Sequence, residues 1–231
     1  VAAIIKEVKN HTLTVCMAAL TLEAGGMEPE ELLQELKSCG LNMDNSEEIE
    51  IYKDEEFQDA HMMEHLRKLL QLSGLSEMQT NILRNLSLLP LSGIFKAYFR
   101  KWLCLDNANE INYLIRYGFI MEDAENKKIA LHPLIQEIML LETMPSISNC
   151  KTMLDSLHLI CLAHGLDVRK PQSIINSLIS ICDHIINDMP EYYLLFLQDT
   201  FPYFDKYLVT DYLPKLVERM EYVMGKMESI S

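Results

Sequence analysis

Apolar side chains recur at helical spacing along most of this chain, and this periodicity restricts the fold more than any other feature. Between residues 56 and 72, for example, Phe57, Leu66 and Leu69 fall on or near one face of a helix. Most of the 8 glycines and 8 prolines stand between such segments, where they begin or end helices. The sequence therefore predicts a mainly α-helical protein.

The pattern changes between residues 76 and 131. Three short helices are predicted there. The first begins at a capping box formed by Ser76 and Gln79 and ends at Pro90. Ser92 caps the second, and the third is capped by Asp106 or Asn109 and ends at Gly118. Two runs with strand character follow at 119–121 and 128–131, and the polar turn 122–127 joins them into a predicted hairpin. Three short helices followed by one hairpin is the element order of a winged helix with a small β-wing.

These patterns divide the chain into four parts. A helical bundle is predicted over residues 1–73, a winged-helix domain over 74–142 and a Ser- and Asn-rich linker over 143–149. The bundle helices are expected on either side of Asn10-His11, from Pro29 to Cys39-Gly40, and over 56–72. Residues 150–231 are predicted to form a C-terminal helical array, TPR-like or of another α-repeat type. Its helices are expected at 150–164, 171–187, 190–209 and 211–228.

The sequence carries no sign of export or membrane insertion. No run of 18 or more apolar residues is free of charge, and the N-terminus lacks the basic start, apolar stretch and cleavage site of a signal peptide. The 6 cysteines form no Cys-x-x-Cys pair and have apolar neighbours, as reduced core residues do. We therefore expect a soluble cytoplasmic protein with no membrane partner. Because the chain starts with Val1 rather than Met, we also expect a piece of a longer protein.

Charge argues against nucleic acid as a partner. The net charge is −14, and residues 1–73 alone carry 6 basic and 15 acidic side chains. The third helix of a winged helix would enter the DNA major groove, and here it offers one basic residue, Arg116, and one acidic residue, Glu110. A winged-helix transcription regulator that binds DNA is nevertheless the alternative function.

Two short motifs point to a known family. The first is Ile4-Ile5 followed by Asn10-His11-Thr12-Leu13-Thr14-Val15, and the second is Leu131-His132-Pro133-Leu134-Ile135-Gln136-Glu137. Together with the order of bundle, winged helix and helical array, they make residues 1–142 resemble one part of the NB-ARC-type switch ATPases of the STAND class. In that family, this part follows the nucleotide-binding core.

The resemblance implies where a nucleotide would be contacted. The first motif is similar to the Gly-Leu-Pro-Leu-Ala segment near the bound adenine, which assigns adenine contact to Thr12 and Leu13, with Thr12 in place of the family's proline. The second is similar to the Met-His-Asp motif, whose His reaches the β-phosphate of ADP. His132 matches that His, and Pro133 replaces the Asp. An imidazole at a helix start can donate to an anionic oxygen. The alternative is that His132 caps its own helix or packs under the hairpin.

The phosphate-binding loop itself is missing. The sequence contains no Gly-x-x-x-x-Gly-Lys-Ser/Thr motif. We therefore expect a non-catalytic regulatory segment, with ADP or ATP bound in the intact parent and no cofactor bound by this segment alone. The expected partners are the parent's own nucleotide-binding domain and an unknown protein or small-molecule ligand on the helical array. Oligomerisation is expected on activation.

A zinc metallopeptidase is a remote alternative. His61-Met62-Met63-Glu64-His65 fits His-x-x-Glu-His, in which two His side chains bind one zinc ion and the Glu acts as a base. Glu142 is a candidate third ligand. The 34 acidic residues make such a match easy by chance, and no strands precede the motif. We therefore expect no metal, and we expect His61 and His65 to be residues of an amphipathic helix.

Overall fold

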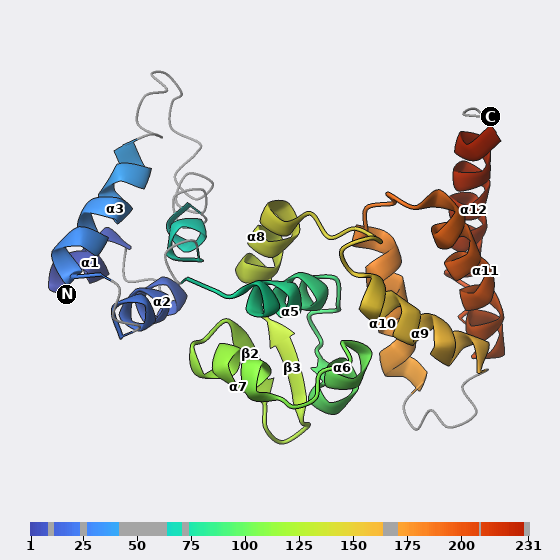
Figure 1. Ribbon diagram of the computed structural model, residues 1–231, viewed down its shortest axis with the longest axis horizontal. Helices are drawn as coiled ribbons and strands as arrows, with labels where there is room; N and C mark the ends of the chain where they lie inside the picture. The colour runs from blue at the N-terminus through green and yellow to red at the C-terminus, as the bar shows by residue number, and fades with distance from the viewer. Residues whose placement is uncertain are drawn as a thin grey trace.

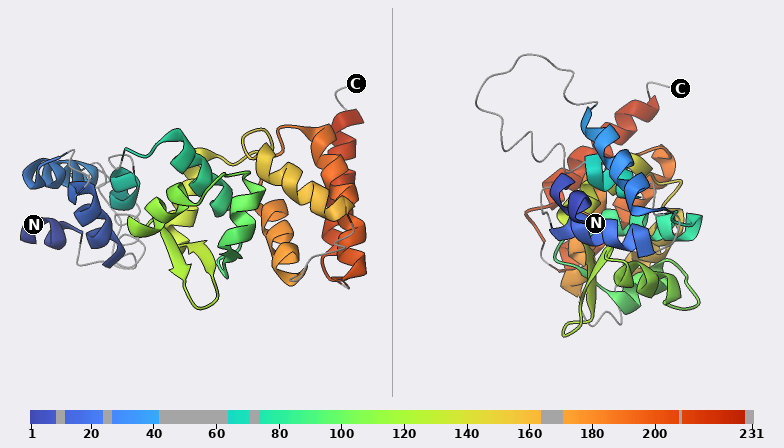
Figure 2. Two further views of the ribbon diagram at one scale, coloured as in Figure 1. Left: turned by 60° about the horizontal axis from the view of Figure 1, so that its bottom comes forward. Right: turned by 90° about the vertical axis from the view of Figure 1, so that its left-hand side faces the viewer.

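The computed structural model describes residues 1–8, 12–23, 27–41, 64–70, 74–163, 171–207 and 209–228. These residues form a mainly helical protein with one small antiparallel sheet. Figure 1 shows three groups of elements in a row along the longest axis, with the two termini at opposite ends. The same succession is visible after rotation in Figure 2. The mainly α fold predicted from periodicity is confirmed.

The N-terminal group contains α1 (Ala2–Glu7), α2 (Thr12–Glu23), α3 (Pro29–Leu41) and a helical stretch over residues 64–70. The predicted break near Asn10-His11 lies outside the described ranges, and the described helices on either side of it end at Glu7 and begin at Thr12. Of the helix predicted over 56–72, the structure describes 64–70. Apolar side chains from each element share one buried core, among them Ile4, Met17, Leu32 and Leu66.

The central group begins with α5 (Glu77–Ser87), whose predicted capping box is confirmed. Ser76 Oγ accepts from the Gln79 amide at 3.2 Å, and Gln79 Oε1 accepts from the Ser76 amide at 2.9 Å. The group continues with β1 (Ile94–Phe95), α6 (Lys96–Trp102), α7 (Asn109–Arg116), β2 (Ile120–Asp123), β3 (Lys128–Leu131) and α8 (Pro133–Thr143).

The predicted hairpin is confirmed and gains a third strand. β2 and β3 pair antiparallel, with Ile120 opposite Leu131, and β1 adds to the free edge of β3, with Ile94 opposite Ile129. The strand order is therefore β1-β3-β2. The alternating burial along β3 turns Ile129 and Leu131 into the core.

Two predicted helix caps are wrong. Ser92 does not cap a helix, because Gly93 turns the chain at a φ of +80° and the next two residues pair as β1. The helix after it begins only at Lys96. Neither Asp106 nor Asn109 caps α7, whose N-cap is Ala108. The side chain of Asn107 instead accepts from the Asn109 amide at 2.9 Å, so an Asn-centred turn leads the chain into the helix.

The C-terminal group holds α9 (Lys151–Leu162), α10 (Pro171–His184), α11 (Pro190–Lys206) and α12 (Leu213–Glu228). Each falls within a few residues of its predicted bounds. The segment predicted as a linker is packed rather than extended into solvent. Ile147 is fully buried, and Ser146 forms a parallel bridge with Ile186. Within the described ranges, no helix is both long and apolar enough to cross a bilayer.

Candidate functional site

His132 lies between the end of β3 and the first residue of α8. Its backbone is extended, with φ −62° and ψ 141°, and its Nδ1 accepts from the Leu134 amide at 3.3 Å. Pro133 has no amide hydrogen to be satisfied at the first helical position. The structure thus gives His132 the capping contact of the alternative interpretation. Because Nδ1 accepts, a neutral ring carries its proton on Nε2, where it is a donor.

Gln136 lies one turn along α8 from His132. Its Nε2 donates to the carbonyl of Ser87 at 2.7 Å and to that of Leu89 at 2.8 Å. These carbonyls belong to the C-terminal end of α5 and the residues after it, where a helix leaves acceptors without an internal partner. Gln136 therefore fixes α8, and with it His132, against α5.

Thr12 and Leu13 lie in a different group from His132. Thr12 is the exposed first residue of α2, and Leu13 is half-buried behind it. α2 packs with α1 and α3, whereas α8 packs on α5 (Figure 1). The structure therefore does not bring the two predicted nucleotide-contacting segments together around one site.

Arg67 joins the N-terminal group to the central one. Its guanidinium lies 3.2 Å from Glu64 and 2.7 Å from Glu142 on α8. All three side chains are about one-third exposed, so solvent screens this pairing and leaves it weak. Arg67 and Glu142 also line an open hollow of about 310 Å³ between residues 64–70, α5 and α8.

The zinc alternative rests on residues that the structure describes in part. His61 lies outside the described ranges, Glu64 is paired with Arg67, and His65 is buried. Glu142, the candidate third ligand, contacts the same Arg67. Among the residues that the structure describes, no three or more His, Cys, Asp or Glu side chains gather where they could hold a metal ion.

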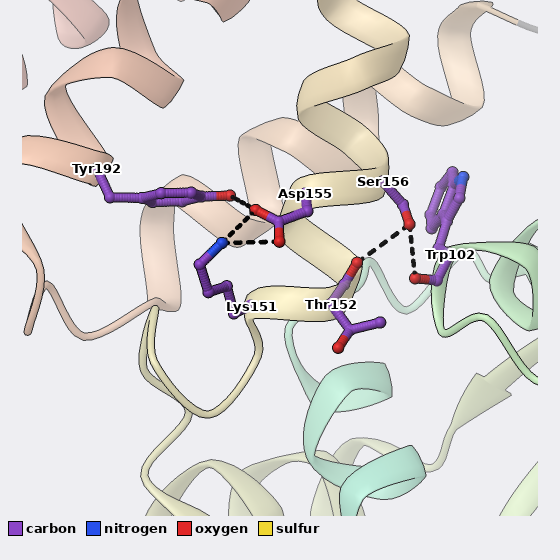
Figure 3. A network of polar contacts seen from close by, with 6 residues as sticks. All are labelled: Trp102, Lys151, Thr152, Asp155, Ser156 and Tyr192. Carbon is purple, nitrogen blue, oxygen red and sulfur yellow. Dashed lines mark hydrogen bonds and ion pairs between the residues drawn. The ribbon is translucent and has the colours of Figure 1, made fainter.

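Like Arg67–Glu142, a second polar contact connects two groups, here the central and C-terminal ones (Figure 3). Ser156 Oγ on α9 donates toward the Trp102 carbonyl at 2.9 Å and also lies 3.1 Å from the Thr152 carbonyl. Trp102 and Ser156 line an open, mainly apolar hollow of about 360 Å³ between α6, α9 and α10. The contact ties the end of α6 to the middle of α9.

The other side of α9 is fixed to α11 by Asp155. This carboxylate accepts from the Lys151 ammonium at 2.7 Å and from the Tyr192 hydroxyl at 2.8 Å (Figure 3). Partial burial acts to raise the pKa of Asp155, but the hydrogen bonds from Lys151 and Tyr192 outweigh it and lower that pKa. Lys151 also lies over the Tyr192 ring, 4.7 Å from its centroid.

α7 offers little to a DNA backbone. Arg116 is its only basic residue, and this side chain lies 3.9 Å from Glu23 at the end of α2. Glu110, in the first turn, accepts from Gln79 at 2.8 Å. Most other cations of the central group lie on α6, at the end of the turn between β2 and β3, and at the start of β3.

Sequence reasoning missed Arg67, Gln136 and Ser156. Gln136 left a weak signal, because it stands four residues after His132 and so shares a face of the helix with it. Arg67 and Ser156 left none, since their partners Glu142 and Trp102 are far away along the chain.

Comparison of the chain with protein-family models, with curated proteins and with solved structures gave no match. No relative therefore supplies a role for His132, Thr12 or Leu13. Of these residues, His132 enters the proposal below, through the family resemblance of its motif and the contacts described above.

Proposed function

We propose that this chain is a non-catalytic regulatory segment of a nucleotide-dependent signalling switch. Residues 1–73 act as a lid-like bundle, residues 74–142 as a winged helix that gates the nucleotide site, and residues 150–231 as a helical array that senses a partner. ADP or ATP is held by a nucleotide-binding domain in the same full-length protein.

The element order supports the winged-helix assignment. The succession α5, β1, α6, α7, β2 and β3 is three short helices followed by a hairpin, with β1 pairing on the hairpin's open edge. A helix-rich group precedes this unit and another follows it, as in the switch ATPases that the sequence resembles.

The observation that carries the nucleotide role is the position of His132. It follows the last strand directly and is the N-cap of α8, a helix of 11 residues. The N-terminus of a helix is the positive end of its dipole and therefore attracts anions. Its Nδ1 accepts from the Leu134 amide, so the neutral ring is an Nε2–H donor, the kind of group that pairs with a phosphate oxygen. Gln136 holds this helix start in place through its contacts with α5.

The contacts between the groups, Arg67–Glu142 and Ser156–Trp102, supply the points at which the groups would move relative to one another. In the ADP state, His132 and the bundle pin the winged helix against the nucleotide-binding domain. The exposed Arg67–Glu142 pair can break at small cost when a partner on the helical array and exchange to ATP favour the open state. The freed winged helix then becomes available for oligomerisation.

The test is thermal melting of the full-length protein with and without ADP. A ligand that binds only the folded state raises the midpoint by mass action. We expect ADP to raise the midpoint of the wild type and to raise that of His132→Ala much less. His132→Asn is the informative companion, because Asn retains a capping oxygen but lacks the imidazole donor.

His184→Ala is the matched control, since it removes an exposed imidazole from the last turn of α10. It should respond to ADP as the wild type does. The proposal fails if ADP stabilises neither protein, or if His132→Ala and His132→Asn respond as fully as the wild type. In that event the next assay is DNA binding at several salt concentrations.

A further inference from the structure

Cations from two elements of the central group gather around one open hollow. Lys96 begins α6, Arg100 lies one turn further along it, and Lys127 ends the turn between β2 and β3. All three line a hollow of about 490 Å³ together with the rings of Phe95 and Tyr98. That volume is in the range of ligand-binding clefts in proteins, roughly 300–1,000 Å³.

The backbone fixes Lys127 at the edge of this hollow. The Lys96 amide donates to the Lys127 carbonyl at 3.1 Å, which ties the turn to the start of α6. Lys127 has a φ of +55°, a left-handed conformation uncommon for a residue with a side chain. The turn before it is stabilised because both nitrogens of Asn126 donate to the Asp123 carboxylate, at 3.0 and 2.8 Å. Lys127 is thus part of a defined turn.

Two of the three cations are not neutralised. Glu122 also lines the hollow, but its carboxylate lies 2.8 Å from Lys96 Nζ and is compensated there. In the part of the chain that the structure describes, the side chains of Arg100 and Lys127 have no hydrogen bond or ion pair. The charged side chains that line the hollow are therefore net positive, whereas the chain as a whole carries a net charge of −14.

Aromatic rings lie beside the cations. Phe95 and Tyr98 meet edge to face with centroids 5.5 Å apart, and Tyr98 stacks on Trp102 at 6.4 Å. Lys128 Nζ lies 5.7 Å from the Phe95 ring centroid on the same side of the unit. A molecule with a flat ring and an anionic tail meets both requirements, because bases stack on aromatic side chains and phosphates pair with Arg and Lys.

We propose that this hollow binds a nucleoside phosphate, with Arg100 and Lys127 on the phosphates and Phe95 and Tyr98 against the base. The site is separate from the one in the proposed function. Lys127 precedes β3 and His132 follows it, so the two lie at opposite ends of the strand, about 16 Å apart for extended chain. Binding here needs no other domain.

The experiment is a titration of this 231-residue chain with ATP in EDTA, followed by fluorescence. Trp102 is the only tryptophan, and its ring stacks on Tyr98 at the hollow, so it reports occupancy. We expect a saturable change with ATP. Adenosine and tripolyphosphate should each bind at least about tenfold more weakly, since each supplies only half of the contacts.

The double variant Arg100→Ala, Lys127→Ala should also bind ATP at least about tenfold more weakly, because it removes two charge-assisted contacts. Lys101→Ala is the matched control. It removes a cation from the same helix, next to Arg100, that lines the neighbouring hollow instead. This control should keep the wild-type affinity, and circular dichroism should show the same fold for all variants.

Four results would overturn the proposal. They are the absence of a saturable change, equal ATP affinity in the double variant, tripolyphosphate binding as tightly as ATP, and a single-stranded oligonucleotide binding far more tightly than ATP. If His132→Ala abolishes ATP binding and the double variant does not, the nucleotide belongs to the switch site instead. Failure of the Arg100–Lys127 site alone leaves the His132 proposal standing.

Discussion

Replacing Gln136 with Met removes two hydrogen-bond donors and keeps a side chain of similar length. Both donors serve carbonyls at the end of α5, those of Ser87 at 2.7 Å and Leu89 at 2.8 Å. Ser87 and Leu89 are 0% and 2% exposed, so water replaces the lost bonds poorly. Gln and Met have similar helix propensity, so propensity adds little to the difference.

The magnitude follows from the two bonds. A typical protein hydrogen bond contributes about 0.5–1.5 kcal/mol net, so Gln136→Met should lower the free energy of unfolding by about 1–3 kcal/mol. Glu137→Met is the matched control, because Glu137 is the exposed neighbour on the same helix. That substitution should change the free energy by no more than about 0.5 kcal/mol.

The assay is urea unfolding followed by the fluorescence of Trp102. This residue is buried in the central group and is the only tryptophan, so the transition it reports belongs to that group. Exchange of the last amides of α5 should quicken in Gln136→Met and stay unchanged in Glu137→Met. Equal urea midpoints for the two variants at equal slope would refute the assigned role of Gln136.

Two further predictions concern backbone conformation and thiol chemistry. Gly93→Ala should destabilise the central group by about 1–3 kcal/mol, because Gly93 has a φ of +80° and an added Cβ would lie 3.1 Å from the Ile129 carbonyl. Gly225→Ala, in an exposed helical position with open space, should instead stabilise by about 0.5–1 kcal/mol, and thermal melts of both would check the pair. Burial raises the pKa of three thiols to about 12, so these thiols stay protonated at pH 8 in the folded protein. Because the thiolate is the reactive form, they should resist iodoacetamide, whereas two exposed thiols should react. The buried set is Cys150, Cys161 and Cys182, and the exposed set is Cys16 and Cys104. Mass spectrometry after labelling distinguishes them, and alkylation of the buried set at the rate of the exposed set would contradict the packing of the C-terminal core.

Local signals in the sequence predicted the local structure. The Ser76–Gln79 capping box, the hairpin around its polar turn and the start of α8 at Pro133 each depend on residues within a few positions. The strand β1 was missed for the opposite reason. A Ser before an apolar run predicts a helix cap, and only pairing with β3, more than thirty residues later, makes Ile94 and Phe95 extended.

The contacts of the candidate site likewise divide into those between neighbouring residues, which the sequence predicts, and those between distant residues, which it does not. The position of His132 before Pro133 predicted the cap that the structure shows, whereas the phosphate contact is what the family resemblance implies and stays a prediction. Arg67–Glu142 and Ser156–Trp102 join residues far apart in sequence, and no periodicity carries such information. The hollow beside Arg100 was also beyond sequence reasoning, since Lys127 reaches α6 only through the folded hairpin.

The most direct test of the switch is amide hydrogen exchange of the full-length protein, saturated first with ADP and then with a non-hydrolysable ATP analogue. If His132 and the start of α8 close on the ADP phosphates, the amides from Leu134 onward should exchange more slowly in the ADP state than in the ATP state. Equal exchange in the two states, with both nucleotides bound, would contradict the claim that this helix start gates the nucleotide.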